Sequence, residues 1–437
     1  MSPGTQRQFT ALNPVLNLSS LPLQWSVNAM QRSVNEMNAP ARAHSFQSFF
    51  LGGFECSTHR RSDGVRLDLL ASTKHTRLVV EDYQALARHG IATVRDGLRW
   101  HLIETAPGQY DWSSLMPMLH AANGCGTQVI WDLCHYGWPD DLDIWSPEFV
   151  DRFANFAAAA AAVIRRETDG IPFYCPVNEM AFWAWAGGDV GRFNPCAQGR
   201  GPELNRQLVR AAIAGSRAVR SVDPRAKFVC AEPLINVLPS SADPDHVHAA
   251  EAKRLSQFES IDLLTGRLEP ELGGSPDLLD LVGMNYYPDN QWYLGGSTVP
   301  MGHYAYRPLS EMIKEAQQRF GVPIFLAETG AEGSSRAAWL NYVCAEVSEA
   351  MAQGVPVAGV CLYPVVDYPG WEDGRLCPVG LLSAPDSHGT RAAYPPLAQE
   401  LRRQQRIFAR TRKQLYAVEH ATRTRHAEHV RKAEHVR

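Results

Sequence analysis

Short apolar runs alternate with longer amphipathic segments along most of the chain. Eight of the short runs are almost entirely apolar and rich in β-branched or aromatic residues; they cover 49–55, 91–98, 127–134, 172–179, 227–233, 279–287, 322–328 and 356–363. A strand that is buried on both faces of a parallel sheet has this composition. The pattern therefore predicts eight parallel strands.

The segments between these runs have apolar positions at helical spacing. Five helices are predicted, at 77–89, 147–166, 202–222, 308–320 and 334–353, with Ser146 as an N-cap and Gly90 as a C-terminal cap. Eight strands separated by helices predict an α/β fold, a (β/α)₈ TIM barrel that forms a single catalytic domain. The segment from 49 to about 400 exceeds the roughly 250 residues of such a barrel, so several βα loops are enlarged. A doubly wound sheet is the alternative, but no G-x-G-x-x-G follows the first strand.

Composition and charge are those of a globular protein without a membrane segment. Apolar residues make up 45% of the 437 residues, and the formal net charge is -4. No uncharged run approaches the roughly 20 apolar residues of a membrane span. The first twenty residues lack the basic and apolar regions of a secretory signal. The nine cysteines form no C-x-x-C pair, which is typical of buried, reduced thiols. We therefore expect a cytoplasmic protein with no membrane partner.

The two ends of the chain differ from its centre. Residues 1–45 are polar and form an N-terminal extension to which the sequence assigns no role, and 46–400 form the predicted barrel. Residues 401–437 form a basic, His-containing C-terminal tail with 11 Lys and Arg against three Glu, a balance of +8 that leaves -12 for the rest. A basic tail can contact nucleic acid. Because this one has no recognition motif, a solvated helix is the favoured interpretation, and neither nucleic acid nor a particular oligomeric state is predicted.

Polar residues close several of the predicted strands. In (β/α)₈ barrels the catalytic groups lie at the C-terminal ends of the strands. Glu179 ends the fourth predicted strand and Glu328 the seventh. Two carboxylates about 5 to 5.5 Å apart can act as nucleophile and general acid on a glycosidic bond. Glu55 and Glu232 close the first and fifth strands and are rival candidates, but no neighbouring motif supports them.

Five motifs in a fixed order carry a resemblance to a known family. VNEM at 177–180 lies at the end of strand four, LAETG at 326–330 lies at the end of strand seven, and the segments 131–157, 280–288 and 363–382 agree in order. These motifs resemble those of the β-glucosidase-like glycoside hydrolases of family 1, retaining enzymes built on (β/α)₈ barrels. The resemblance covers roughly residues 49 to 390. It implies a retaining β-glycosidase that hydrolyses a small glycoside through a covalent glycosyl-enzyme intermediate, without a metal ion or cofactor.

The resemblance also assigns the reacting groups. Glu328 matches the nucleophile, and Glu179 matches the general acid that later serves as the base for water. This division requires Glu179 to be protonated near neutral pH while Glu328 is ionised. Arg95 and Tyr287 match side chains that donate to the nucleophile. From the sequence alone, Arg95 could instead pair with Asp96 or Glu104.

Other positions match residues that bind the sugar. By resemblance, Asn178 holds the 2-hydroxyl and His135 reaches the 3-hydroxyl, while Tyr363 and Trp371 lie where the family has aromatic platforms; Asn285 completes the set. Each has a structural alternative, since a strand-end His is often a hydrogen-bonded structural residue and a loop Trp often packs within its loop.

Three departures from the family bear on the substrate. His59 stands where a sugar-binding Gln is expected, Gly370 replaces a Glu, and Tyr363 replaces a Trp. Either Glu372 or Asp373 could supply the missing carboxylate. We therefore expect ordinary β-glucosides to be poor substrates, a sugar altered at position 4 or 6 to be preferred, and Gly370→Glu to shift the preference towards glucose.

Three other functions are compatible with parts of the pattern. A transglycosylase would use the same intermediate with a different acceptor. A catalytically silent carbohydrate-binding barrel has no need of both Glu179 and Glu328 together with Arg95 and Tyr287. A metal-dependent sugar-phosphate isomerase or hydrolase would require clustered ligands such as H-E-x-x-H, and the sequence has no such spacing.

Overall fold

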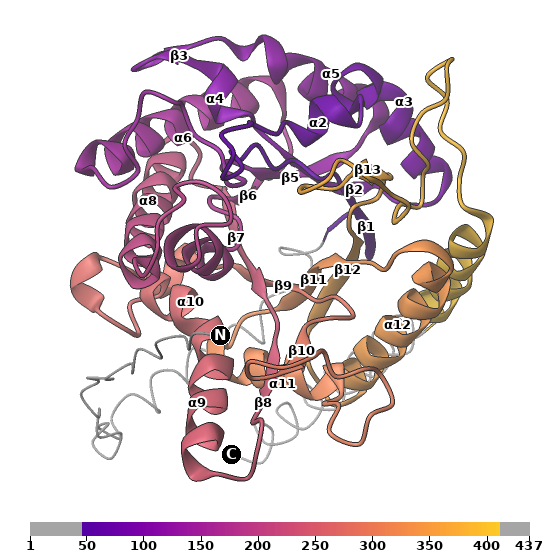
Figure 1. Cartoon of the computed structure of the whole chain (residues 1–437). Helices are drawn as coiled ribbons and strands as arrows, with labels where there is room; N and C mark the ends of the chain where they lie inside the picture. Colours follow the sequence, from indigo (N-terminus) through magenta and orange to yellow (C-terminus); the bar gives the residue numbers. More distant parts are fainter. Residues whose placement is uncertain (1–45, 411–437) are drawn as a thin grey trace, which may run out of the picture. The chain divides into compact units, whose positions relative to one another are not determined.

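Eight parallel strands close into a barrel at the centre of the described chain (Figure 1). The computed structural model describes residues 46–410, so the predicted N-terminal extension and residues 411–437 of the predicted tail lie outside the described residues. The barrel strands are β1 (Phe50–Gly53), β2 (Thr93–Gly97), β5 (Gln128–Asp132), β6 (Phe173–Cys175), β7 (Lys227–Pro233), β9 (Leu281–Asn285), β11 (Ile324–Thr329) and β12 (Val357–Leu362). Each overlaps one predicted strand, which confirms the predicted (β/α)₈ fold.

The first and last strands close the barrel by pairing with each other. Leu51 of β1 is opposite Thr93 of β2 on one side and opposite Cys361 of β12 on the other. Around the barrel the order is β1-β12-β11-β9-β7-β6-β5-β2. Because all eight strands are parallel, their C-terminal ends meet at one mouth, and the polar residues that close the strands gather there.

Helices surround the barrel, as Figure 1 shows. They are α3 (His75–Arg88), α5 (Met116–Cys125), α6 (Pro147–Glu167), α8 (Gly201–Val222), α10 (Glu259–Leu264), α11 (Leu309–Phe320) and α12 (Arg336–Ala352). All five predicted helices are among them. In α6, Phe149, Phe153 and Phe156 are buried at helical spacing, which fixes the face that packs inward. Ser146 is the N-cap residue of α6, but its hydroxyl donates to the carbonyl of Asp143 instead of capping the helix.

The barrel interior is filled with side chains below the mouth. Leu51, Phe173 and Phe325 belong to this apolar cluster. Phe46 precedes β1 and closes the N-terminal end, with its ring centroid 5.3 Å from that of Phe173 and 5.1 Å from that of Phe325. The packed interior leaves the C-terminal mouth as the place where a ligand can reach the strand ends.

The βα loops are enlarged, as predicted. The additional elements around the barrel are α2 (Leu69–Ser72), α4 (Trp100–Ile103), β3 (Glu104–Ala106) with β4 (Gln109–Tyr110), α7 (Met180–Trp183) with the π-helix Ala184–Asp189, β8 (Asn236–Leu238), α9 (Pro244–Leu255), β10 (Gln291–Tyr293), and β13 (Tyr368–Pro369) with β14 (Leu376–Cys377). Strand β10 pairs with β8, which joins two of these loops.

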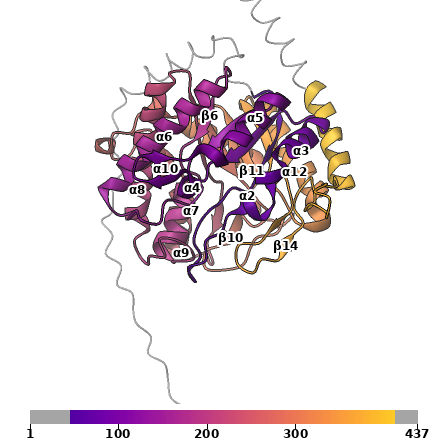
Figure 2. The same ribbon diagram turned by 90° about the horizontal axis from the view of Figure 1, so that it is seen from above.

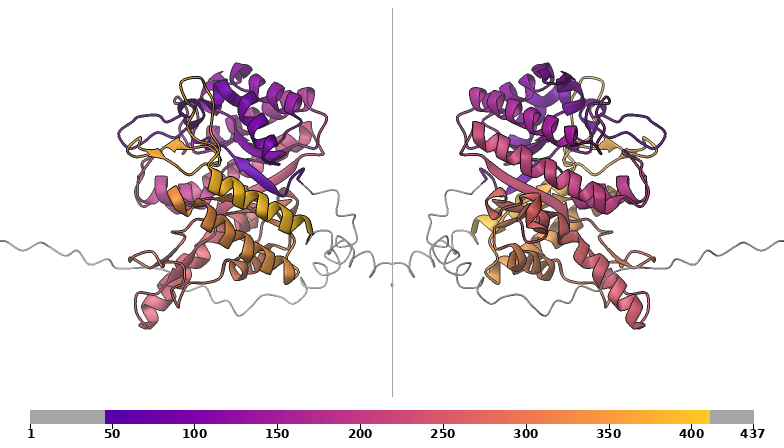
Figure 3. Two further views of the ribbon diagram at one scale, coloured as in Figure 1. Left: turned by 90° about the vertical axis from the view of Figure 1, so that its right-hand side faces the viewer. Right: turned by 90° about the vertical axis from the view of Figure 1, so that its left-hand side faces the viewer.

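A last helix, residues 395–410, crosses the boundary that the sequence suggested at residue 400. It lies beside α3 and α12 (Figures 2 and 3). Phe408 is buried and stacks on Phe49 with a centroid distance of 4.5 Å, and Gln405 donates to the carbonyl of His89 at 2.8 Å. The first ten residues of the predicted basic tail are therefore part of the packed barrel, because one face of this helix is apolar.

Two composition-based expectations can be compared with residues 46–410. Cys56, Cys134, Cys175, Cys230 and Cys361 are all buried and unbonded, as predicted. Within this part of the chain, no helix combines the length and the apolarity needed to cross a membrane.

Candidate active site

Arg95 on β2 connects the polar groups at the barrel mouth. Its fully buried guanidinium donates to the two carboxylate oxygens of Asp132 at 3.0 and 2.8 Å and to Glu328 Oε1 at 2.8 Å. It also donates to Asn178 Oδ1 at 2.5 Å. A buried cation needs such partners to offset its lost hydration. Arg95 therefore holds side chains from β5, from the segment after β6 and from β11 around one centre.

The alternative partners of Arg95 bond to other groups. Asp96 accepts from Tyr83 Oη and lies 2.9 Å from His75 Nε2. Glu104 accepts from Arg152. The contact between Arg95 and the seventh-strand glutamate was the one implied by the family resemblance.

Glu328 lies near the end of β11 and is almost completely buried. Arg95 holds one of its oxygens, and Tyr287 Oη donates to the other, Oε2, at 2.9 Å. The pairing between β11 and β9 shifts register between Leu326 and Glu328, and such irregularities re-aim side chains at the rims of barrels. Both predicted donors to Glu328 are thus in contact with it.

Glu179 follows β6 and begins α7 with a left-handed backbone, φ 45°. This conformation is strained for a residue other than Gly. The Glu179 N–H donates to the carbonyl of Ala231 at 2.9 Å. Asn285 Nδ2 donates to Glu179 Oε1 at 2.7 Å, and Tyr136 Oη donates to Oε2. Asn285 therefore contacts the general-acid candidate, and both carboxylate oxygens of Glu179 are held.

The two candidate carboxyl groups have perturbed acidities. Burial raises the pKa of Glu179, and burial together with the charge of Glu179 raises the pKa of Glu328 to about 8. The raised pKa of Glu328 differs from the expected division, in which Glu328 is ionised and Glu179 holds the proton. The contacts still favour that division, because the cation Arg95 donates to Glu328 while Asn285 and Tyr136, the donors to Glu179, are neutral. The pair titrates as one coupled unit.

The rival carboxylates also lie near the mouth. Glu232 closes β7, and its Oε2 accepts the N–H of Ala181 at 3.1 Å, which supports the start of α7. Burial, with the charge of Glu179 adding to it, raises the pKa of Glu232 well above its usual value. Glu55 accepts the N–H of Ser57 at 3.1 Å and lies 3.9 Å from His135 Nε2. Among the described hydrogen bonds, neither Glu55 nor Glu232 accepts one from Arg95, the cation that holds Glu328.

Asn178 and His135 form one hydrogen-bonded chain. Asn178 Nδ2 donates to His135 Nε2 at 3.0 Å and to Tyr136 Oη at 3.1 Å. His135 Nδ1 then carries the proton and faces Asp132 at 3.1 Å. Burial lowers the pKa of His135, but the contact with Asp132 and the charge of Glu55 outweigh it, so the net pKa is raised.

Sequence reasoning missed Tyr136 and Asp132, although both lie in the motif around His135. Tyr136 contacts Glu179 directly, and Asp132 anchors both Arg95 and His135. An aspartate at the end of a buried strand was a usable signal. The position of the tyrosine hydroxyl was not, because it depends on a left-handed backbone at Tyr136, φ 63°.

The loops after β1 and β12 supply a different group of side chains. The His59 and Trp371 rings are 4.5 Å apart. His59 Nδ1, Trp371 Nε1 and Tyr363 Oη are buried, and each is without a hydrogen-bond partner in the described structure. Burial lowers the pKa of His59 to about 3, so its imidazole is neutral. The Tyr363 ring lies against Gly53, where a Cβ atom would be 2.1 Å from Tyr363 Cδ2.

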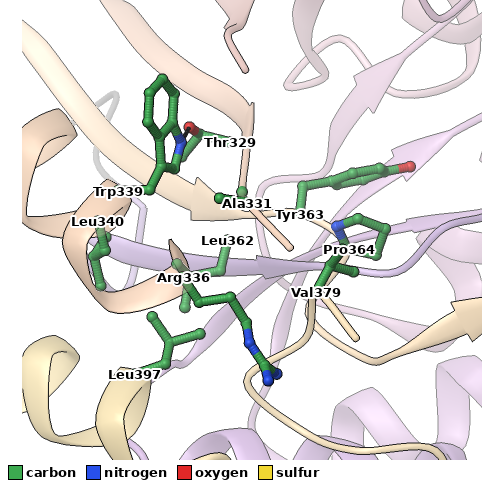
Figure 4. A pocket seen from close by; sticks show the side chains of 11 residues that line it. Thr329, Ala331, Arg336, Trp339, Leu340, Leu362, Tyr363, Pro364, Val379 and Leu397 are labelled. Atoms are coloured by element: carbon green, nitrogen blue, oxygen red, sulfur yellow. Dashed lines mark hydrogen bonds between the residues drawn. The ribbon is translucent and has the colours of Figure 1, made fainter. Parts of the chain in front are cut away.

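A small cavity borders this group (Figure 4). In the close-up, the Tyr363 hydroxyl points away from Trp339 and Arg336. The lining residues come from β11, α12, the end of β12 and the segments that follow it: Thr329, Gly330, Ala331, Arg336, Trp339, Leu340, Leu362, Tyr363, Pro364, Val379 and Leu397. Neither catalytic candidate is among them, so this cavity lies next to the site and is not the site itself.

The loop after β12 does not supply a substitute carboxylate. Glu372 is exposed and pairs with Arg192, and Asp373 accepts the N–H of Arg375 at 3.0 Å. A Cβ atom on Gly370 would be 3.1 Å from Asp373 Oδ1 and 3.3 Å from Cys377 Sγ. A glutamate at this position would require Asp373 or Cys377 to shift by a few tenths of an ångström, and its effect on the sugar preference stays a prediction.

One group of possible metal ligands occurs among the described residues. Atoms of Cys56, Asp132 and His135 lie within 4.8 Å of one another. Both oxygens of Asp132 accept from Arg95, and His135 Nδ1 lies 3.2 Å from Cys56 Sγ. A cation here would face the guanidinium of Arg95, so the group is better suited to hold that side chain than a metal ion.

Comparison with solved structures shows that this barrel has the fold of β-glucosidases of family 1. The family 1 β-glucosidase from Thermotoga maritima superposes with a TM-score of 0.67 and 14% identity, covering 82% of this chain and 98% of the enzyme. The AHE enzyme from Alicyclobacillus herbarius gives a TM-score of 0.68 and 16% identity, covering 84% and 99%. No protein-family model matches the sequence, and no curated protein matches it. The predicted resemblance to family 1 β-glucosidases is confirmed at the level of the fold.

Proposed function

We propose that the chain is a retaining β-glycosidase that hydrolyses a small glycoside. The observation that carries this proposal is the pair of buried carboxylates at the barrel mouth, each held by its own donors. Arg95 and Tyr287 hold Glu328, and Asn285 and Tyr136 hold Glu179. A binding site for a sugar has no need of two such carboxylates, whereas double displacement requires both.

In the first step, Glu328 attacks the anomeric carbon while Glu179 gives its proton to the leaving oxygen, so the glycosidic bond breaks as the glycosyl-enzyme bond forms. In the second step, Glu179 takes a proton from water, the water oxygen attacks the anomeric carbon, and Glu328 leaves as a carboxylate. Arg95 and Tyr287 favour the charged form of Glu328 in which the cycle starts and ends.

The comparisons support a small sugar-like ligand. The Thermotoga maritima β-glucosidase was solved with glucoimidazole and with deoxynojirimycin.

The altered residues His59, Tyr363 and Gly370 favour a glycone other than unmodified glucose, as proposed from the sequence. The unbonded cysteines of the described chain support a reducing, cytoplasmic location.

The test is a screen of aryl β-glycosides that differ only in the sugar, followed by labelling with the 2-fluoro derivative of the best substrate. Peptide mass mapping is expected to locate the glycosyl adduct on Glu328. An adduct on Glu55, Glu232 or Glu332 would contradict the assignment of the nucleophile. Release of inverted product from every active substrate would contradict the retaining mechanism.

A further inference from the structure

The amide of Asn178 has no free N–H group. One Nδ2 hydrogen goes to His135 Nε2 at 3.0 Å and the other to Tyr136 Oη at 3.1 Å, while Oδ1 accepts from Arg95 at 2.5 Å. Asn178 is completely buried. An amide nitrogen has two hydrogens to donate. A sugar hydroxyl could therefore receive a hydrogen bond from Asn178 only by displacing one of these partners.

Tyr136 is fixed in its place by its surroundings. The side chain is 1% exposed, and its ring centroid lies 4.7 Å from that of His135, 5.3 Å from that of Phe193, 5.6 Å from that of Trp183 and 5.8 Å from that of Trp371. Its hydroxyl also donates to Glu179. Rings packed on several sides leave no room for the rotation that would release Asn178.

The position of Asn178 relates it to one carbon of the substrate, on the basis of the proposed function. Arg95 links Asn178 to Glu328, and Tyr136 links it to Glu179. The anomeric carbon must lie between these carboxylates, and C2 is bonded to it. Asn178 is thus the side chain beside the C2 substituent. In retaining glycosidases, hydrogen bonds to the 2-hydroxyl that strengthen in the transition state contribute about a hundredfold or more to the rate.

We propose that the Tyr136 hydroxyl takes the hydrogen-bonding place of the substrate's 2-hydroxyl at Asn178, so that this site acts on 2-deoxy glycosides about as well as on their 2-hydroxy parents. The phenol bridges the same two side chains, Asn178 and Glu179, that a hydroxyl on C2 and the glycosidic oxygen would approach. Tyr136 is in this respect a specificity-determining residue, and through its donation to Glu179 it is also a positioning residue.

The donation from Tyr136 has a second consequence, for the acidity of Glu179. Besides Tyr136, the charged and titratable groups that act on Glu179 are Arg95 on β2, His135 after β5, Glu232 on β7, Tyr287 after β9 and Glu328 on β11. The hydrogen bond from Tyr136 lowers the pKa of Glu179 against the larger effect of burial. Removal of this hydrogen bond raises the pKa of Glu179, so the acid form persists to higher pH. The basic limb in the pH profile of kcat/KM is therefore expected to move to higher pH.

The experiment measures kcat/KM for 4-nitrophenyl β-D-glucoside and 4-nitrophenyl 6-deoxy-β-D-glucoside, each with and without the 2-hydroxyl. In the unchanged protein, each 2-deoxy glycoside is expected within about tenfold of its parent. Tyr136→Phe frees one N–H of Asn178, so the parent should gain about tenfold over the 2-deoxy glycoside, and the basic limb should move up. Tyr110→Phe, which removes a hydroxyl from the β3–β4 hairpin, should change neither quantity.

Two results would overturn the inference. A preference of a hundredfold or more for the 2-hydroxy parent in the unchanged protein would show that Asn178 binds the 2-hydroxyl despite Tyr136. In Tyr136→Phe, the basic limb of the pH profile could stay in place and the ratio of kcat/KM between the 2-hydroxy and 2-deoxy glycosides could stay unchanged. That result would show that Tyr136 only fills space. Both outcomes leave the proposed function intact, whereas no turnover of any aryl β-glycoside and no adduct on Glu328 would overturn that function and this inference with it.

Discussion

The two sides of the barrel mouth differ in how their polar atoms are satisfied. On the reaction side, both oxygens of Glu179 and of Glu328 accept hydrogen bonds. Arg95 donates to Asp132, Glu328, Asn178 and the carbonyl of Ala327. Among the groups around the two carboxylates, Asn285 Oδ1 and Glu232 Oε1 have no described partner. On the recognition side, formed by the loops after β1 and β12, buried atoms of Tyr363 and Trp371 have no described partner. Leaving a buried polar atom unpaired costs about 1 to 3 kcal/mol. A ligand that bonds to these atoms would remove this cost.

This difference separates what the chain does from what it acts on. In the proposed function, Glu179 and Glu328 are held in place before substrate arrives, which is the arrangement expected of groups that stabilise a transition state. In the proposed function, the unpartnered atoms of the recognition side bond to the sugar when it binds. Changes on the reaction side should therefore affect the rate of the chemical steps, and changes on the recognition side should affect binding.

The largest effect is expected for Glu328→Gln. The amide cannot form the glycosyl-enzyme bond, so kcat should fall by at least about 10⁴-fold, as it does when single members of other catalytic groups are removed. Steady-state assays with the best aryl glycoside measure this. The matched control is Glu332→Gln, which changes an exposed glutamate four residues away that pairs with Arg375. A loss of less than tenfold in Glu328→Gln would place the reaction elsewhere.

Glu179→Gln should have the next largest effect, and one that depends on the leaving group. General acid catalysis contributes about 10² to 10⁴-fold, so glycosides with poor leaving groups should lose that much while activated aryl glycosides lose far less. Because burial raises the pKa of Glu179, its acid form persists above the usual range, and activity falls as pH rises through that raised pKa. The variant should therefore lack the basic limb. Equal losses on both kinds of substrate would contradict the acid role.

The same contrast explains what the sequence could predict. The eight strands were predictable because each is a continuous apolar run. The position of Glu179 and Glu328 at the barrel mouth was predictable because each closes such a run. A strand fixes the direction of its own residues, so groups at strand ends converge once the barrel is known.

Loop residues were harder to interpret. Gly370 was expected to mark a missing sugar contact, but its Cβ direction is set by the turn between β13 and β14, and it faces Asp373. Tyr136 reaches Glu179 through a left-handed backbone that no periodic pattern reveals. The helix at 395–410 was divided at residue 400, because a high content of Lys and Arg masked an apolar face that includes Phe408.

A third prediction tests the recognition side through stability. The pKa of His59 is lowered to about 3 by burial, so the unfolded chain binds a proton below about pH 6.5 that the folded protein does not bind until about pH 3. The free energy of unfolding should therefore fall by about 3 kcal/mol between pH 7 and pH 4 through this group. In His59→Gln that part of the fall should disappear, as measured by urea unfolding at both pH values.

The control for this measurement is His388→Gln, which replaces an exposed histidine and should follow the unchanged protein. If His59→Gln lost as much stability towards pH 4 as the unchanged protein, the imidazole would have a partner that accepts its proton. The buried polar atoms of the recognition side would then have hydrogen-bond partners, as the two carboxylates of the reaction side do, and the two sides would not differ in this respect.

The smallest effect is expected for Tyr363→Phe, which removes one buried hydroxyl that has no described partner. Because no protein hydrogen bond is lost, the free energy of unfolding should stay the same or rise slightly. If the hydroxyl instead bonds to the sugar, KM should rise about tenfold with little change in kcat. Tyr174→Phe, which removes another buried, unpartnered hydroxyl from β6, should leave KM unchanged. A loss of stability in Tyr363→Phe with an unchanged KM would mean that the hydroxyl serves the fold, and that the open hydrogen bonds of the recognition side are not reserved for substrate.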